Sequence, residues 1–174
     1  MNYLRTAAIL AVTLLAVPVA GAEVSTAVSL LKDDGGMGAE IGKVYFKDTD
    51  KGLEVRPRLK GLPPGEHGFH VHEKGSCAAV TKDGKAVPGL AAGGHYDPKG
   101  AGKHEGPQGG GHLGDLPPLK VDKDGNAAGS LLAPRLKVGD LKGRALVIHA
   151  GGDNFSDSPK PLGGGGARIA CGKI

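Results

Sequence analysis

Short apolar runs, each ended within a few residues by glycine, proline or aspartate, dominate this chain. Its 174 residues include 32 glycines and 12 prolines, and both residue types disfavour the interior of a helix. Runs of β-branched and apolar residues, alternating in part with polar ones, lie at residues 23–31, 41–47, 53–59, 67–73, 119–121, 128–132, 145–149 and 167–170. No segment has a convincing amphipathic helical period. About eight short strands joined by such turns predict an all-β fold, an antiparallel sandwich or closed barrel.

Two long stretches between these runs have no period at all. Residues 75–118 are rich in glycine, proline, lysine and histidine, and residues 151–166 are rich in glycine and serine. Loops of this length are uncommon in a compact domain unless they are functional or disordered. We therefore expect both loops to carry the function, and a bound metal ion would order the longer one, residues 75–118.

The first 22 residues have the pattern of a signal peptide. Arg5 precedes an apolar run from Ala7 to Val19, and the small residues Ala20-Gly21-Ala22 suit cleavage before Glu23. Residues 23–174 are then one domain of ordinary size. No later run approaches the roughly 20 apolar residues of a membrane-spanning helix. The sequence thus predicts an exported protein with no membrane span.

The charge of the mature chain gives no support for nucleic-acid binding. Arg5 is the one charged residue of the leader, so 21 of the 22 Lys and Arg residues remain against 18 Asp and Glu, a net charge of +3. There is no tryptophan, and lysine and arginine form no cluster. Nucleic-acid partners are therefore not expected.

The chain has two cysteines, Cys77 and Cys171. An even number behind an export signal indicates one disulfide rather than a thiolate metal site, with free thiols as the alternative. Such a bridge would close a loop of more than ninety residues. The loop-entropy model then gives at most about 4–5 kcal/mol of stabilisation.

All seven histidines fall between residues 67 and 149. His70 and His72 are two apart on one expected strand, so both imidazoles point to the same face. The first long loop has a denser group, with three histidines and one aspartate within 21 residues: His95, His104, His112 and Asp115. Three nitrogens and one oxygen suit tetrahedral zinc, which would supply folding energy to a glycine-rich loop. Each feature also has an interpretation without metal. His70 and His72 would be a chance pair on an exposed strand, His149 a core histidine bonded to backbone, and the loop a solvated segment.

Six motifs in order, GFHVHE, GGHYDP, GKHEGP, GHLGDLP, VIHAGGDN and GGGGARIACG, resemble the copper-zinc superoxide dismutases in their exported bacterial form. The resemblance covers nearly all of residues 23–174. It implies an eight-stranded antiparallel Greek-key barrel or sandwich with two long functional loops, and a periplasmic location. It also implies an oxidoreductase that disproportionates superoxide, with one copper and one zinc ion per chain. It leaves open whether the protein is a monomer or a homodimer.

The resemblance also implies ligands for both ions. The predicted copper set is His70, His72, His95 and His149, and the predicted zinc set is His95, His104, His112 and Asp115. His95 belongs to both sets, so its ring would bridge the two ions and exchange a proton during the reaction. Four imidazole nitrogens suit copper(II) on ligand type as well.

Three further residues receive roles by the same resemblance. Asp153 is expected to link a copper histidine with a zinc histidine, His70 with His104, and so to fix their ring orientation. Arg168 is expected to guide the anionic substrate, and His67 to brace loop backbone without binding metal. The alternative function is a non-catalytic copper or zinc carrier on the same fold, because a fold does not determine a function.

Overall fold

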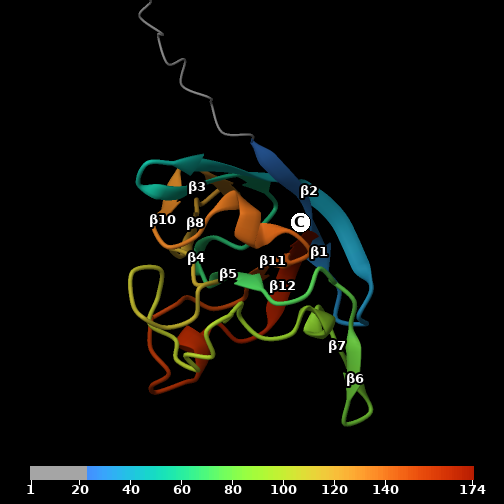
Figure 1. Ribbon diagram of the computed structural model, residues 1–174. Helices are drawn as coiled ribbons and strands as arrows, with labels where there is room; N and C mark the ends of the chain where they lie inside the picture. Colours follow the sequence, from blue (N-terminus) through green and yellow to red (C-terminus); the bar gives the residue numbers. More distant parts are fainter. Residues whose placement is uncertain (1–22) are drawn as a thin grey trace, which may run out of the picture.

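The computed structural model describes residues 23–174, so the predicted signal peptide lies outside the described residues. Twelve strands and three short 3-10 turns follow one another along the chain (Figure 1). The strands are β1 (Val24–Leu31), β2 (Met37–Thr49), β3 (Gly52–Lys60), β4 (Gly65–His67), β5 (Phe69–His72), β6 (Val80–Lys82), β7 (Lys85–Val87), β8 (Leu119–Val121), β9 (Asn126–Ala128), β10 (Leu131–Ala133), β11 (Ala145–His149) and β12 (Arg168–Lys173). The turns are η1 (Leu90–Ala92), η2 (Val138–Leu141) and η3 (Leu162–Gly164).

The strands form an antiparallel barrel. Its main sheet has the order β10-β3-β2-β1-β12-β11-β5, with β9 also on β3, and β4 pairs with β8. The turn between β8 and β9, held by Asp122 N–H donating to the Asn126 carbonyl at 2.9 Å, connects the β4–β8 pair to the strand β9 on β3. The connections from β3 to β4 and from β10 to β11 join strands that are not neighbours, which makes the topology a Greek key. The expected all-β barrel is confirmed.

The long barrel strands fill the interior with the side chains of one face. Val44 and Phe46 on β2 and Leu53 and Val55 on β3 are fully buried, each pair at the two-residue spacing of a strand face. Phe69 on β5 is also fully buried and belongs to the same core cluster. The polar side chains of β5 therefore leave the barrel on its other side.

The structure departs from the expected strands at three places. Residues 67–73 are interrupted at Gly68, whose N–H donates to the Gly151 carbonyl at 2.7 Å, and residues 128–132 are divided between β9 and β10. The expectation of one irregular loop over residues 75–118 is wrong for β6 and β7, a hairpin that projects from the barrel (Figure 1). Its strands have three residues each, too few to establish a period. The Asp83-Gly84 pair at its turn is a sequence signal for a hairpin. Both residues have the positive φ that such a turn requires.

The disulfide between Cys77 and Cys171 is present, with the two Cα atoms 5.7 Å apart. It joins residues separated by 94 positions and so ties the start of the first long loop to β12. Neither cysteine is available as a metal ligand. Among the described residues no helix has the length and apolar character needed to cross a membrane.

Candidate metal centre

Strand β5 is the platform of the candidate site. Its odd-numbered side chains, Phe69 and Val71, enter the core, and His70 and His72 leave on the opposite face, yet both histidines are almost fully buried. They are covered by the two long loops, which lie on one side of the barrel (Figure 1). His149, at the end of the neighbouring strand β11, brings a third imidazole to the same face.

Backbone hydrogen bonds attach the first long loop to β5. Tyr96 N–H donates to the Val71 carbonyl at 2.8 Å, and Val71 N–H donates to the Gly114 carbonyl at 2.8 Å. His95 lies opposite His72, and Asp115 lies opposite His70, as isolated strand pairs. The loop thus runs beside β5 like two extra strands, and it delivers His95 and Asp115 to the histidine face.

The predicted copper set converges. His70, His72, His95 and His149 each offer a ring nitrogen within 4.8 Å of the others, and all four are buried. His72 Nδ1 lies 3.0 Å from the Gly93 carbonyl and His149 Nδ1 lies 3.1 Å from the Gly166 carbonyl, so each Nδ1 carries the proton. The two Nε2 atoms, left with lone pairs, face each other at 3.4 Å. A cation between them would remove this repulsion.

Two more ring nitrogens of this set are buried without a hydrogen-bond partner. They are His70 Nδ1 and His95 Nε2. An unpaired buried polar atom costs about 1–3 kcal/mol, and a metal ion satisfies both at once. The donor set and its bare nitrogens therefore fit a copper ion.

The predicted zinc set converges around Asp115. His95 Nδ1 lies 2.9 Å from Asp115 Oδ1, and His104 Nδ1 lies 3.0 Å from Oδ2 without hydrogen-bond geometry. His112 Nδ1 is 3.6 Å from Oδ1 and has no hydrogen-bond partner. The group of ligand atoms that lie within 4.8 Å of one another here contains His70 in place of His112. The His70 and His95 rings are stacked, with centroids 3.9 Å apart. His112 lies at the margin of this group, and its role as a ligand stays a prediction.

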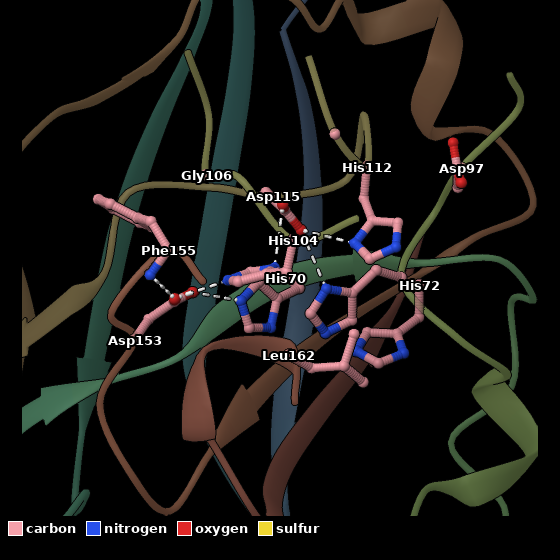
Figure 2. Close-up of polar contacts among 12 residues, drawn as sticks. His70, His72, Asp97, His104, Gly106, His112, Asp115, Asp153, Phe155 and Leu162 are labelled. Atoms are coloured by element: carbon pink, nitrogen blue, oxygen red, sulfur yellow. Dashed lines mark hydrogen bonds and ion pairs between the residues drawn. The ribbon is translucent and has the colours of Figure 1, made fainter. Parts of the chain in front are cut away.

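Asp153 connects the two sets through its two carboxylate oxygens. His70 Nε2 donates to Oδ2 and His104 Nε2 donates to Oδ1, each at 2.7 Å (Figure 2). The backbone N–H of Phe155 also donates to Oδ1, at 2.8 Å. These bonds leave the Nδ1 lone pairs of both rings directed away from Asp153. A single carboxylate therefore fixes one histidine of each set.

The electrostatic environment favours the metal-binding protonation states. Burial lowers the pKa of His70 to about 3 and the pKa of His149 to about 4, and it also lowers the pKa of His72 and of His95. These four imidazoles are therefore neutral at pH 7, as a metal ligand must be.

Asp115, Asp153 and His104 instead favour their charged forms. Burial opposes ionisation of Asp115 and Asp153, but close contacts with His104 and a second histidine hold both carboxyl pKa values well below their usual range. Burial also opposes the charged form of His104, yet its close contacts with the carboxylates of Asp115 and Asp153 raise its pKa to about 9. Two ionised carboxylates thus create a local demand for positive charge, which a divalent cation meets.

A cavity of about 350 Å³ opens onto the predicted copper set. His72, His95, His149 and Arg168 line it together with apolar residues that include Leu162. The guanidinium of Arg168 donates from Nη1 to the Gly89 carbonyl and from Nη2 to the Gly93 carbonyl, the latter at 2.6 Å. The Gly93 carbonyl is also the partner of His72 Nδ1. Sequence reasoning missed this carbonyl, because a backbone acceptor leaves no mark in the residue type.

His67 lies outside both sets. Its Nδ1 is 2.8 Å from the His149 carbonyl and its Nε2 is 2.8 Å from the Pro63 carbonyl. This arrangement agrees with the expected bracing role.

Gly163 is a second residue whose importance the sequence did not reveal. It lies in the run of four glycines with φ +71°, and a Cβ atom there would lie 2.1 Å from Asp153 Oδ1 and 2.8 Å from His104 Nε2. Only a residue without a side chain allows the loop to pass this close.

We expect Gly163→Ala to weaken metal binding by about 10- to 100-fold, the usual effect of losing an outer partner of a metal ligand. The added methyl group pushes Asp153 away from His104. Metal content after dialysis against a chelator measures this. Gly164→Ala is the matched control, because Gly164 has a similar φ of +78° but a Cβ there meets only Lys160 carbons at 3.7 Å or more. Equal losses in both variants would assign the effect to backbone strain.

Comparison with known proteins gives one consistent family. Residues 40–174 match the family model described as copper/zinc superoxide dismutase. The chain is 62% identical over 140 residues to a Cu-Zn superoxide dismutase of Escherichia coli K12, covering 80% of this chain and 81% of the relative. It is 54% identical over 140 residues to the Brucella abortus enzyme, with the same coverage of 80% and 81%.

Solved structures agree with these matches. The Cu/Zn superoxide dismutase from Brucella abortus superimposes with a TM-score of 0.85 at 49% identity, covering 88% of this chain and 99% of that one. The monomeric copper, zinc superoxide dismutase from Salmonella enterica gives a TM-score of 0.79 at 55% identity, with coverage of 88% and 99%. A SOD-like protein from Bacillus subtilis gives 0.64 at 32% identity, with coverage of 90% and 99%.

Proposed function

The chain belongs to the copper/zinc superoxide dismutase family, and from this premise we propose how its own residues carry out the family's reaction. Two superoxide anions and two protons become one dioxygen and one hydrogen peroxide. The observation that carries the proposal is the pair of adjoining ligand sets that share His95 and leave five buried ligand atoms without hydrogen-bond partners.

We assign the copper ion to His70, His72, His95 and His149, and the zinc ion to His95, His104, His112 and Asp115. Copper supplies a one-electron redox couple, and zinc supplies a redox-inert charge that holds the loop. The bare nitrogens of the first set and the carboxylate at the centre of the second support this division. The family and its cofactors leave the non-catalytic carrier without support.

The side chains have distinct tasks in the reaction. His95 presents Nε2 to the copper set and Nδ1 to Asp115, so Nε2 can hold a proton and return it to the reduced substrate while the ring stays anchored on the zinc side. Arg168 places a fixed positive charge on the cavity wall, where it attracts and orients a small anion. Asp153 keeps the rings of His70 and His104 in place.

We also propose that residues 1–22 are a cleaved signal peptide and that residues 23–174 work in a periplasm. The disulfide supports an oxidising compartment, since such bonds are rare where thiols are kept reduced.

Superoxide removal by the mature chain should depend on copper. After both metals are stripped, we expect zinc alone to restore no activity, and copper with zinc to restore a rate near the diffusion limit of about 10⁸–10⁹ M⁻¹s⁻¹. Pulse radiolysis measures this rate directly. A protein that binds both ions yet leaves superoxide at its spontaneous decay rate would be a carrier.

Arg168→Ala should retain both metals but react at least about 10-fold more slowly, because it removes a steering charge and no ligand. The remaining rate should also depend less on ionic strength. Arg58→Ala is the matched control, since it removes the same charge from an exposed position on β3. A rate for Arg168→Ala equal to that of the control at low salt would exclude a role in steering.

A further inference from the structure

Arg135, just after β10, makes an unusual set of contacts with the first long loop. Its guanidinium donates four hydrogen bonds to four backbone carbonyls of one short segment, and the side chain is partly buried. Nε donates to Pro107 at 3.1 Å, Nη1 to Gly111 at 3.0 Å, and Nη2 to Gly106 at 3.2 Å and to His112 at 2.6 Å.

The segment that Arg135 holds, residues 103–112, carries two of the predicted zinc ligands. It folds back on itself so that His112 N–H donates to the Lys103 carbonyl at 2.9 Å, which places His104 and His112 on the two arms of one turn. The turn contains four glycines, and a Cβ at Gly111 would lie 2.3 Å from the Lys103 carbonyl oxygen. Side chains therefore cannot pack inside this turn, and glycine-rich backbone has much entropy to lose when it is ordered.

We propose that Arg135 is a positioning residue for zinc, holding the turn of residues 103–112 in its binding shape before the ion arrives. The inference rests on the zinc assignment made above. The planar guanidinium presents five N–H donors in a fixed arrangement, which suits several acceptors at once, whereas lysine is a flexible point charge. A site ordered in advance binds more tightly because less entropy is lost on binding.

The direction in which zinc affinity changes when Arg135 is replaced distinguishes positioning from a purely electrostatic role. A positive charge near a zinc ion repels it, so removing the Arg135 charge would by electrostatics alone tighten zinc binding. Loss of the four hydrogen bonds would instead weaken zinc binding. Positioning also predicts that Arg135→Lys, which keeps the charge, loses zinc affinity nearly as much as Arg135→Met.

The test is zinc titration of the metal-stripped, disulfide-bonded mature chain in competition with a chromophoric chelator. We expect both Arg135 variants to bind zinc about 10- to 100-fold more weakly than the parent chain, with copper affinity unchanged. Arg56→Met is the control, because the guanidinium of Arg56 pairs with the carboxylates of Glu23 and Glu54 rather than with the backbone of the turn. Amide exchange of residues 103–112 without metal should be faster in the Arg135 variants alone.

Each alternative outcome has a defined meaning. Parent-like zinc affinity in both variants overturns the inference, as does tighter binding by Arg135→Met. Equal losses of zinc and copper affinity, shared with Arg56→Met, would show general destabilisation and overturn it too. Should Arg135→Met fail to fold, Arg135→Lys decides the matter by the same criteria. Failure of the parent chain to bind zinc would instead overturn the zinc assignment itself.

Discussion

His72→Ala is expected to lower the rate of superoxide removal by more than about 100-fold, because the loss of even an outer partner of a metal ligand costs 10- to 100-fold. His72 is proposed as a direct ligand, and its Nε2 faces His149 Nε2 at 3.4 Å. The barrel should stay folded, since the core side of β5 is formed by Phe69 and Val71. Copper content and superoxide decay by pulse radiolysis measure the two effects separately.

Val71→Ala is the matched control for this experiment. It truncates the neighbouring side chain on the core side of the same strand and should cost about 2 kcal/mol of unfolding free energy. It removes no ligand, and the backbone bonds of Val71 to Tyr96 and Gly114 remain. Copper-dependent activity of the control should therefore be normal below its unfolding temperature. Full activity in His72→Ala after metal restoration would disprove the ligand assignment.

Removing both ions should lower the thermal midpoint by at least about 10 °C. An ion present at 1,000 times its dissociation constant stabilises the folded state by about 4 kcal/mol, and each kcal/mol moves the midpoint of a domain this size by about 2–4 °C. Differential scanning calorimetry before and after chelation gives the shift.

The effect should also be local. Amide exchange in residues 94–116 and 151–166 should accelerate after chelation, because these loops cover β5 with few apolar contacts of their own, while β1, β2 and β3 keep their protection. Zinc alone should restore protection of the first loop. An unchanged midpoint and unchanged exchange would show that the histidines bind metal without ordering the fold.

The sequence predicts the strands that are apolar or β-branched runs bounded by turn residues. Residues 119–121 and 145–149 were expected as strands and are β8 and β11 with the same bounds. The position of His70 and His72 on one face of β5 also follows from period two. The break at Gly68 could not be predicted in this way, because it depends on a hydrogen bond with Gly151, far along the chain.

The residues of the candidate site can also be separated into those that the sequence predicts and those that it does not. The six histidines and Asp115 were expected to converge from residue type, spacing and family resemblance, and the structure brings them together. Gly163, Arg135 and the Gly93 carbonyl were not foreseen. Gly163 contributes by having no side chain, Arg135 by hydrogen bonds to backbone oxygens, and Gly93 by its own backbone oxygen. None of these contributions produces a recognisable residue pattern along the chain.

The shared carboxylate of Asp153 has a thermodynamic consequence for metal loading. Oδ2 accepts a hydrogen bond from His70 of the copper set, and Oδ1 accepts one from His104 of the zinc set. An ion that fixes either ring therefore also reduces the freedom of the other ring. The coupling free energy between two sites is the same in both directions. Whatever zinc adds to the affinity for copper, copper must add to the affinity for zinc, and we therefore expect the two ions to bind as a cooperative pair.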